Sequence, residues 1–306
     1  MRFVVLGDLH YSDYTDPAHA AARDRLFGAF FQQVARLEAD LVFAIGDTTN
    51  RGTMTEMVGL EEIAKATALP FVRIMGNHDC YSLSKPEISP FFLGGRPPVS
   101  SEQAYTSFDS DNIRFLLLDT ARDRDYKRYD GFVSETQLAW LGQQIEEFNA
   151  NPALELLMAF GHHPIYNTTR RSADTMLYIA NSEAVHGIFN QAKSKPGFYF
   201  CGHNHCHSLA GPDAANWYHV QTADPLDCQS FRLITIIGER VAIEVINFDL
   251  SDPQLRQDFE TARTSIEAGF NPQSYAWVHG QPHEHNLVVD LAASRAFTRE
   301  ALTQAH

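Results

Sequence analysis

Five short polar motifs, each led by a glycine, are the feature that most constrains how this chain can fold. Each motif falls at or just after the end of a predicted strand, where a glycine permits a tight turn and a close backbone approach. In open α/β sheets, the carboxyl ends of strands are where ligands bind. The motifs therefore predict one binding site at a sheet edge, built from Gly7-Asp-Leu-His10, Gly46-Asp-Thr-Thr-Asn-Arg-Gly52, Gly76-Asn-His-Asp79, Gly161-His-His-Pro164 and Gly202-His-Asn-His205.

Apolar, β-branched or aromatic runs alternate along the chain with longer helical patterns. Strands are predicted at 2–6, 41–45, 70–75, 113–118, 154–160, 197–201, 218–222, 231–237 and 241–248. Helices are predicted at about 18–38, 55–67, 134–149 and 182–194. This alternation predicts a layered α/β domain. Because no helix separates the last three strands, part of the sheet structure is expected to be antiparallel or mixed.

The motifs supply carboxylate, amide and imidazole groups, which together suit borderline divalent metals such as manganese, iron or zinc. Asp8 and His10 are two residues apart, so on a continuing strand both would face the same side, and His203 and His205 repeat this spacing. Asp47 stands alone on its turn, and its two carboxylate oxygens can bridge two ions. The set contains no cysteine, which argues against a closed structural zinc site. Each pair alone is weak evidence, but five such motifs in this order do not arise readily by chance.

The order of the motifs resembles the signature of the calcineurin-like metallophosphoesterase superfamily, which is D-x-H, G-D-x-x-x-x-G, G-N-H-[DE], H-x-P and G-H-x-H. The resemblance covers residues 1 to about 250 and is specific as a set. It implies a four-layer αββα sandwich, in which helices flank two mixed β-sheets and the metals lie at the sheet edges. It also implies an enzyme that hydrolyses phosphoesters at a dinuclear metal centre.

Carried over motif by motif, the resemblance implies seven metal ligands. One ion would take Asp8, His10, Asp47 and His205, and the other would take Asp47, Asn77, His162 and His203. In H-x-P the ligand is the histidine two residues before the proline, so His162 is chosen over His163. His78 matches the family residue that stabilises or protonates the reacting phosphoryl group. Asp79 is expected to orient the His78 imidazole.

The resemblance further implies hydrolysis by two-metal chemistry. Two ions roughly 3.5–4 Å apart would hold the phosphate, and a hydroxide that bridges them would attack in line. Metal binding lowers the pKa of that water toward about 7, so the nucleophile exists at neutral pH. His78 would stabilise developing charge or protonate the leaving alkoxide, and no covalent enzyme intermediate is needed.

Comparison with subfamily patterns favours a small phosphodiester as the substrate. Protein Ser/Thr phosphatases of this superfamily carry an arginine directly before G-N-H-E, whereas this chain has Arg73-Ile-Met-Gly-Asn-His-Asp79, so that activity is not expected. The overall spacing is more similar to phosphodiesterases that act on cyclic nucleotides or glycerophosphodiesters. A broad phosphomonoesterase is an alternative, because both activities need the same metals. A non-catalytic metal-binding scaffold is a third interpretation, which the completeness of the motifs disfavours.

Charge and composition exclude several classes of partner. The chain has 24 basic and 38 acidic residues, a net charge of −14, which gives no general attraction to a nucleic acid polymer or to anionic lipid. Divalent metals can still reverse the sign of a pocket locally, so a small phosphorylated substrate fits. No segment approaches the ~18 apolar residues that span a bilayer, and no signal-peptide pattern is present. The four cysteines form no C-x-x-C pair. We therefore expect a soluble, cytoplasmic protein with reduced cysteines.

The pattern of the sequence changes after residue 249. This change divides the chain into a predicted catalytic domain at 1–249 and a C-terminal extension at 250–306. The extension contains an amphipathic helical pattern at 253–268 and an apolar run at Leu287–Leu291. We expect it to act as a cap beside the substrate entrance or as a dimerisation element in a homodimer.

Two segments and several histidines lie outside the motifs. Segments 81–103 and 164–181 are predicted to be long surface loops, and loops of this length are often functional. We expect the remaining histidines to have no part in the site. His207 is expected to be hydrogen-bonded or solvated, and surface positions are expected for His279, His283 and His285.

Overall fold

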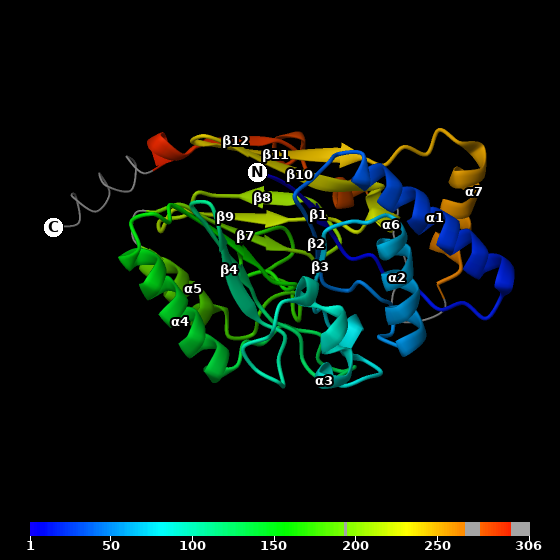
Figure 1. The fold of residues 1–306 in the computed structure, drawn as a ribbon, viewed down its shortest axis with the longest axis horizontal. Coiled ribbons are helices and arrows are strands. Elements are labelled where there is room, and N and C mark those ends of the chain that lie inside the picture. Colours follow the sequence, from blue (N-terminus) through cyan, green and yellow to red (C-terminus); the bar gives the residue numbers. More distant parts are fainter. Residues whose placement is uncertain (193–194, 267–275, 295–306) are drawn as a thin grey trace.

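The computed structural model describes residues 1–192, 195–266 and 276–294, and in it two six-stranded sheets lie face to face (Figure 1). In order across the first sheet, the strands are β12 (Leu287–Asp290), β11 (Arg240–Asn247), β10 (Ser230–Ile237), β1 (Arg2–Leu6), β2 (Leu41–Ile45) and β3 (Phe71–Ile74). Across the second they are β4 (Thr106–Ser110), β5 (Ile113–Leu117), β6 (Leu156–Phe160), β7 (Gly197–Cys201), β9 (Trp217–Gln221) and β8 (Ser208–Ala210). Each sheet contains parallel and antiparallel pairs, so the prediction of mixed sheets is confirmed.

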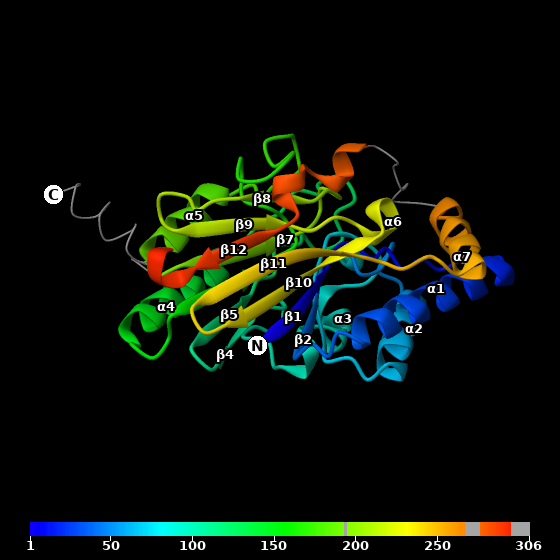
Figure 2. The ribbon, with the colours of Figure 1, turned by 90° about the horizontal axis from the view of Figure 1, so that it is seen from above.

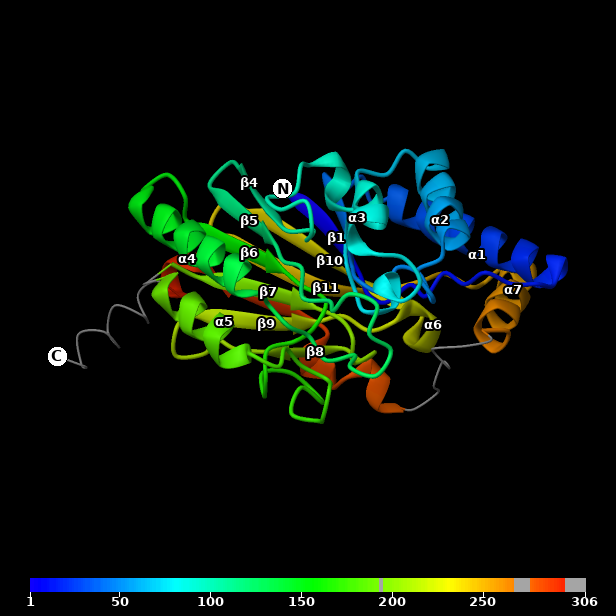
Figure 3. The ribbon, with the colours of Figure 1, turned by 90° about the horizontal axis from the view of Figure 1, so that it is seen from below.

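Helices cover the outer face of each sheet and complete the predicted four-layer αββα sandwich. The longer helices are α1 (Pro17–Ala35), α2 (Met54–Ala66), α4 (Glu135–Ala150), α5 (Ser182–Phe189) and α7 (Pro253–Thr264). Single helical turns occur at α3 (Lys85–Ile88) and α6 (Pro225–Cys228), and 3₁₀ turns at His78–Cys80, Ser89–Phe91, Leu93–Gly95, Asn190–Ala192, Ala276–His279 and Pro282–Glu284. Figure 2 shows α1, α2 and α7 gathered at one side of the first sheet, and Figure 3 shows α4 and α5 over the second.

Local side-chain chemistry fixes where the helices begin. The Asp16 carboxylate accepts the Ala18 amide ahead of α1, and Pro17 occupies the first turn, where no amide hydrogen is needed. At α2, the Thr53 hydroxyl accepts the Glu56 amide while the Glu56 carboxylate accepts the Thr53 amide. These caps satisfy amide groups that a helix leaves unpaired at its start.

The strands are buried on both faces because each sheet lies between the other sheet and a layer of helices. In β1, Phe3 and Val5 face the second sheet, whereas Val4 and Leu6 face α1. The Phe3 ring makes edge contacts, at centroid distances of 5.6 to 6.1 Å, with Phe43, Phe115, Phe160 and Phe200. This aromatic cluster draws on both sheets and therefore sets the spacing between them.

Predicted and observed elements differ mainly where strands are short or polar. The predicted strands and helices are present. The observed ends of the strands differ from the predicted ends by a few residues at most. Strands β4 and β8 were not predicted, because β4 (Thr-Ser-Phe-Asp-Ser) is polar and β8 has three residues. The predicted loop 81–103 contains α3 and two 3₁₀ turns. Positions 193–194 and 267–268, at the ends of two predicted helices, lie outside the described residues.

The described part of the C-terminal region packs on the two-sheet body. Strand β12 pairs with β11 at the edge of the first sheet, and α7 packs on α1, where Arg25 forms an ion pair with Asp258. The buried Glu284 carboxylate accepts hydrogen bonds from Arg170 and from Ser208 at the start of β8. The boundary at residue 249 and a dimerisation role stay predictions. None of the helices in the described ranges is long and apolar enough to cross a membrane.

We predict that Phe3→Ala lowers the free energy of unfolding by about 3–5 kcal/mol, because it opens a cavity between the sheets. Chemical denaturation followed by circular dichroism measures this loss. The matched control is Phe132→Ala, whose side chain is 39% exposed, with an expected loss below about 1 kcal/mol. Equal losses for the two variants would contradict the role assigned to the aromatic cluster.

Candidate metal centre

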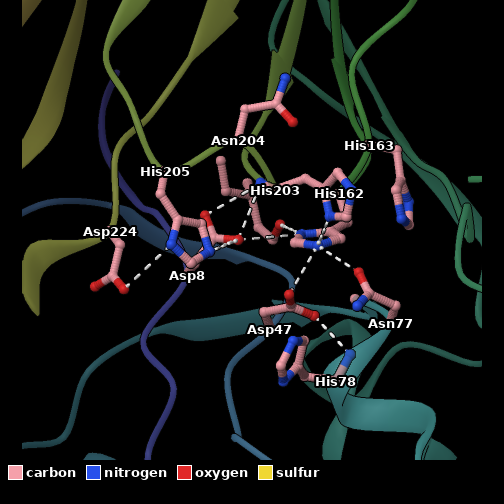
Figure 4. Close-up of polar contacts among 12 residues, drawn as sticks. Asp8, Asp47, Asn77, His78, His162, His163, His203, Asn204, His205 and Asp224 are labelled. Carbon is pink, nitrogen blue, oxygen red and sulfur yellow. Dashed lines mark hydrogen bonds and ion pairs between the residues drawn. The ribbon is translucent and has the colours of Figure 1, made fainter. Parts of the chain in front are cut away.

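The turns that follow the strands of both sheets meet at one edge and bring the five motifs together (Figure 4). In the first sheet, Asp8 follows β1, Asp47 follows β2 and Asn77 follows β3. In the second sheet, His162 follows β6, and both His203 and His205 follow β7. All predicted ligands except His205 are buried. The sequence therefore identified the strand ends at which polar groups from the two sheets converge.

One group of donor atoms centres on the His162 ring. Its Nε2 lies 3.1 Å from Asp47 Oδ2, 3.2 Å from Asn77 Oδ1 and 3.2 Å from His203 Nδ1. Its Nδ1 lies 2.9 Å from the Ile45 carbonyl oxygen, which orients the ring. These four side chains are the ones that the sequence assigned to a single ion.

A second group of donor atoms contains Asp8, His10 and His205. Nε2 of His10 lies 3.2 Å from Nε2 of His205, which in turn lies 3.7 Å from Asp8 Oδ1. One potential ligand atom from each of the three residues lies within 4.8 Å of the others. Asp8, Asp47 and His162 form another such set, so Asp8 and Asp47 adjoin both groups.

The paired ligands come together through turns, so the expectation that strand alternation would align them was wrong. Strand β1 ends at Leu6, and His10 has a φ of 45°, in the left-handed region. His203 and His205 likewise have φ values of 68° and 52°, and Asp47 has 45°. Such backbone conformations cost of order 1–3 kcal/mol each and concentrate at functional sites.

Two of the glycines that lead the motifs are required by close contact. A Cβ atom on Gly46, which has a φ of 93°, would lie 2.4 Å from His162 Nδ1. A Cβ atom on Gly76 would lie 2.2 Å from Asp47 Oδ1. The close backbone approach that the glycines predicted is therefore what lets the ligand-bearing turns meet.

The expectation that Asp79 orients the His78 imidazole was wrong. Nδ1 of His78 lies 2.7 Å from the Asn50 carbonyl oxygen, and the His78 amide donates to Asp47 Oδ1 at 2.8 Å. The Asp79 carboxylate instead accepts the amides of residues 48, 49 and 76 and the hydroxyls of residues 48 and 49. These donors belong mainly to residues 48 and 49, directly after Asp47, so Asp79 fixes the turn that carries Asp47.

The ring nitrogens of the other histidines bond to groups outside the predicted ligand set. The His163 ring nevertheless lies 4.3 Å from that of His203, and His162, His163 and His203 form a further group that could hold a metal. Nδ1 of His163 lies 2.8 Å from Thr120 Oγ1, and its Nε2 lies 3.0 Å from the Tyr129 carbonyl oxygen, whereas His162 faces Asp47. His207 is buried, and its Nε2 lies 2.8 Å from Ser230 Oγ. His279 and His283 are exposed, and Nε2 of the half-buried His285 lies 2.6 Å from the His279 carbonyl oxygen.

Three residues around the centre were missed from the sequence. Nδ1 of His205 lies 3.3 Å from Asp227 Oδ2 and 3.8 Å from Asp224 Oδ2, at the short helix α6. A carboxylate on the outer nitrogen of a metal-binding histidine is a common supporting contact. The Tyr81 hydroxyl accepts a hydrogen bond from Asn77 Nδ2 at 2.8 Å, which leaves Asn77 Oδ1 toward His162. For α6, the sequence signal was Asp224-Pro225, a pair typical of a capped helix start.

The electrostatics of the donor set fit divalent cations. Burial raises the pKa of Asp8, and burial with the nearby His162 lowers the pKa of His203 to about 3. Burial opposes protonation of His162 as well, but Asp47 and Asp8 raise its pKa to about 9. Burial thus disfavours a proton on His203, whereas nearby carboxylates favour one on His162. A divalent cation placed between the carboxylates and the imidazoles would satisfy both kinds of group at once. Carboxylate, amide and imidazole together match manganese, iron or zinc.

A cavity of about 200 Å³ opens onto these groups and has an aromatic wall. It is lined by Asp47, Asn77, His78, Tyr81, Tyr129, Leu177, His203 and His205. The Tyr81 ring stacks on Tyr126 with centroids 4.4 Å apart. Tyr129 is 39% exposed, so with Tyr81 it presents aromatic surface beside the ligands. A larger hollow of about 700 Å³, near Lys85 and Arg122, shares none of these side chains.

Comparisons with known proteins agree with this geometry. A model of the family described as "Calcineurin-like phosphoesterase" matches residues 1–207. A "probable cyclic nucleotide phosphodiesterase" of Rhodopseudomonas palustris is 28% identical over 223 residues, which cover 72% of this chain and 77% of that protein. A "3',5'-cyclic-nucleotide phosphodiesterase" of Nostoc sp. is 24% identical, over 67% of this chain and 74% of its own length.

Among solved structures, the chain is similar in fold to a "dimetal phosphatase" from Danio rerio. The TM-score is 0.67 at 17% identity, and the match covers 80% of this chain and 95% of that one. A purple acid phosphatase from yellow lupin matches with a TM-score of 0.55 at 14% identity, over 80% of this chain and 51% of that one. At these identities the likeness concerns the fold alone.

We predict that Asp79→Asn weakens metal binding by about 10–100-fold, because the amide cannot accept all the donors that fix the Asp47 turn. Metal titration followed by calorimetry measures the affinity. If Asp79 only positions the turn, kcat at saturating metal stays within a few-fold of wild type. A large loss of kcat with unchanged metal affinity would instead restore a direct catalytic role for Asp79.

Proposed function

This chain belongs to the calcineurin-like phosphoesterase family, and from that premise we propose that it hydrolyses small phosphodiesters, cyclic nucleotides above all, with two divalent ions as cofactors. The observation that carries the proposal is the convergence of carboxylate, amide and imidazole donors from both sheets beside a cavity that includes His78. Phosphoric ester hydrolysis is the shared activity of the family, and the relatives' names favour a diester.

Each predicted ligand has a defined role in this proposal. Asp8, His10 and His205 would hold one ion, and Asn77, His162 and His203 the other, with Asp47 shared between them. Bound ions would supply Lewis acidity toward the phosphate and an activated water at neutral pH. The protein supplies orientation: Ile45 fixes the His162 ring, and Tyr81 fixes the amide of Asn77.

His78 is proposed to exchange a proton with the substrate. A carbonyl oxygen can only accept a hydrogen bond, so Nδ1 of His78 must carry a proton to donate to Asn50. Nε2 is then the ring nitrogen that can exchange a proton with the substrate. The side chain lines the cavity, and its ring lies 4.6 Å from that of His10. This position suits a group that stabilises or protonates the leaving oxygen without coordinating metal.

The aromatic wall of the cavity favours a substrate with a planar ring. Tyr81 and Tyr129 line the cavity next to the ligands, and a nucleobase gains stacking energy against such rings. A glycerophosphodiester has no ring to place there. This observation supports cyclic nucleotides within the diester class, in agreement with the names of the relatives.

Metal removal is the first test of this proposal. We expect chelation followed by dialysis to abolish hydrolysis of bis-p-nitrophenyl phosphate, and added manganese to restore it. Asp47→Ala should be the most damaging ligand substitution, because in this proposal Asp47 is the one ligand shared by the two ions. Asp13→Ala, at an exposed carboxylate, is the control and should retain activity. Full turnover in excess chelator would overturn the mechanism.

Comparison of a diester with a monoester tests the reaction class. With manganese bound, kcat/KM for bis-p-nitrophenyl phosphate should exceed that for p-nitrophenyl phosphate, which has the same leaving group. The reverse order would identify a phosphomonoesterase. Activity on neither substrate, nor on cyclic nucleotides, with both metals bound would favour the non-catalytic scaffold.

We predict that His78→Ala lowers kcat by ~10²–10⁴-fold while metal content stays near wild type. The loss should be smaller for bis-p-nitrophenyl phosphate than for a cyclic nucleotide, because a good leaving group needs less protonation. Steady-state kinetics and metal analysis measure the two effects, with the exposed His283→Ala as the control. Loss of both metals from the variant would show that His78 is a ligand.

We predict that Tyr129→Ala raises KM for cyclic AMP by about 5- to 100-fold, the range expected when one base–aromatic contact is lost. KM for a glycerophosphodiester such as glycerophosphoethanolamine should stay within about twofold. Tyr166→Ala removes a tyrosine that is 52% exposed outside the cavity lining, and should change neither value. A similar rise for both substrates would mean that Tyr129 shapes the cavity without reading the base.

A further inference from the structure

Helix α5 lies beside the hairpin of β8 and β9 (Figure 3). A second group of side chains that could hold a metal ion lies between these elements. It consists of His186 from α5, Asp213 from the turn between β8 and β9, and His219 from β9. The Nε2 atoms of both rings lie 3.1 Å from the same oxygen, Asp213 Oδ2. The three ligand atoms all lie within 4.8 Å of one another, and the cluster shares no residue with the proposed catalytic centre.

The Asp213 carboxylate is held so that only one oxygen faces the rings. Its Oδ1 accepts the amides of Ala215 at 2.9 Å and Trp217 at 3.0 Å. Burial alone would raise the pKa of Asp213, but hydrogen bonds from His219 and the Trp217 amide hold it below its usual value. The carboxylate is therefore ionised at neutral pH, and its outer oxygen has the supporting contacts that metal-binding carboxylates have.

The elements that carry the three side chains are docked rigidly on one another. The buried Trp217 indole stacks on Phe189 of α5 with ring centroids 4.1 Å apart. Its Nε1 donates to the Phe189 carbonyl oxygen at 3.0 Å. Packing between α5 and β9 thus holds His186 and His219 near each other, with Asp213 on the turn between β8 and β9.

The two contacts to Asp213 Oδ2 are close to the separations found in a coordination shell. Charge-assisted hydrogen bonds from nitrogen to a carboxylate are usually about 2.7–2.9 Å long. The 3.1 Å contacts to Asp213 are longer, and equal the 3.1–3.2 Å separations around His162 in the catalytic centre. A tetrahedral ion with bonds of about 2.0–2.2 Å places neighbouring ligand atoms about 3.3–3.6 Å apart, so binding would need the cluster to open by a few tenths of an ångström.

We propose that His186, Asp213 and His219 form a zinc site that clamps α5 to the β8–β9 hairpin. Two imidazoles and one carboxylate suit zinc, whereas magnesium and calcium prefer oxygen ligands alone. The His186 and Asp213 side chains are 37% and 24% exposed, and His219 is 3% exposed. Solvent therefore reaches one side of the site and supplies the fourth ligand. The ion would join α5, in the helical layer, to the β8–β9 hairpin at the edge of the second sheet, and would stabilise the folded state.

Metal counting tests this proposal on the full chain. Protein stripped with chelator and equilibrated with zinc should bind one ion more per chain than His186→Ala or Asp213→Asn. Asp213→Asn is the sharper variant, because its amide oxygen still accepts a hydrogen bond but lacks the charge that holds zinc. Zinc should also raise the Tm of wild type more than that of either variant. His283→Ala, at an exposed histidine, is the matched control and should bind as many ions as wild type.

A visible spectrum identifies the bound ion's ligands. Cobalt substituted at the extra site should add a tetrahedral absorption band that is present in wild type and His283→Ala and absent in Asp213→Asn. Equal zinc content in wild type and in both cluster variants would overturn the proposal. The cluster would then be a carboxylate that accepts two hydrogen bonds. Activity on bis-p-nitrophenyl phosphate should be unchanged in the cluster variants, so this test is independent of the proposed function.

Discussion

One histidine joins the two sheets at the edge where the chemistry is placed. His162 follows β6 of the second sheet, and its ring meets the end of β2 in the first sheet through the Ile45 carbonyl oxygen and the Asp47 carboxylate. Both contacts require a fixed spacing between the sheets, and the phenylalanine cluster around Phe3 sets that spacing. Core packing and ligand geometry therefore depend on each other. A substitution that changes the volume of the core should therefore alter the ligand geometry of the metal centre as well as the free energy of unfolding.

The site is assembled under backbone strain that the fold supports. Left-handed conformations at His10, Asp47, His203 and His205 place four side chains where regular strands could not. Glycines without a Cβ let the turns approach, and the Asp79 carboxylate fixes the Asp47 turn through several donors. The backbone and the groups outside the ligand set thus hold these side chains in place.

The sequence predicted the parts of the site that depend on order along the chain. Five motifs at strand ends located the ligand candidates, and the apolar runs located β1, β2 and β7 within their observed bounds. It could not predict contacts that arise only in three dimensions. The partner of His78 is the Asn50 carbonyl and not the adjacent Asp79, and the acidic pair behind His205 comes from α6. Strands β4 and β8 were not predicted. Strand β4 is polar and β8 is short, so neither shows a clear alternation of apolar and polar residues.

The converging donors are proposed to hold two ions in one centre that shares Asp47. Anomalous diffraction from crystals of the intact protein grown with manganese tests this directly. We expect two anomalous peaks roughly 3.5–4 Å apart on either side of the Asp47 carboxylate. One peak should lie beside His10 and the other beside His162. A single peak, or peaks that avoid Asp47, would contradict the dinuclear centre.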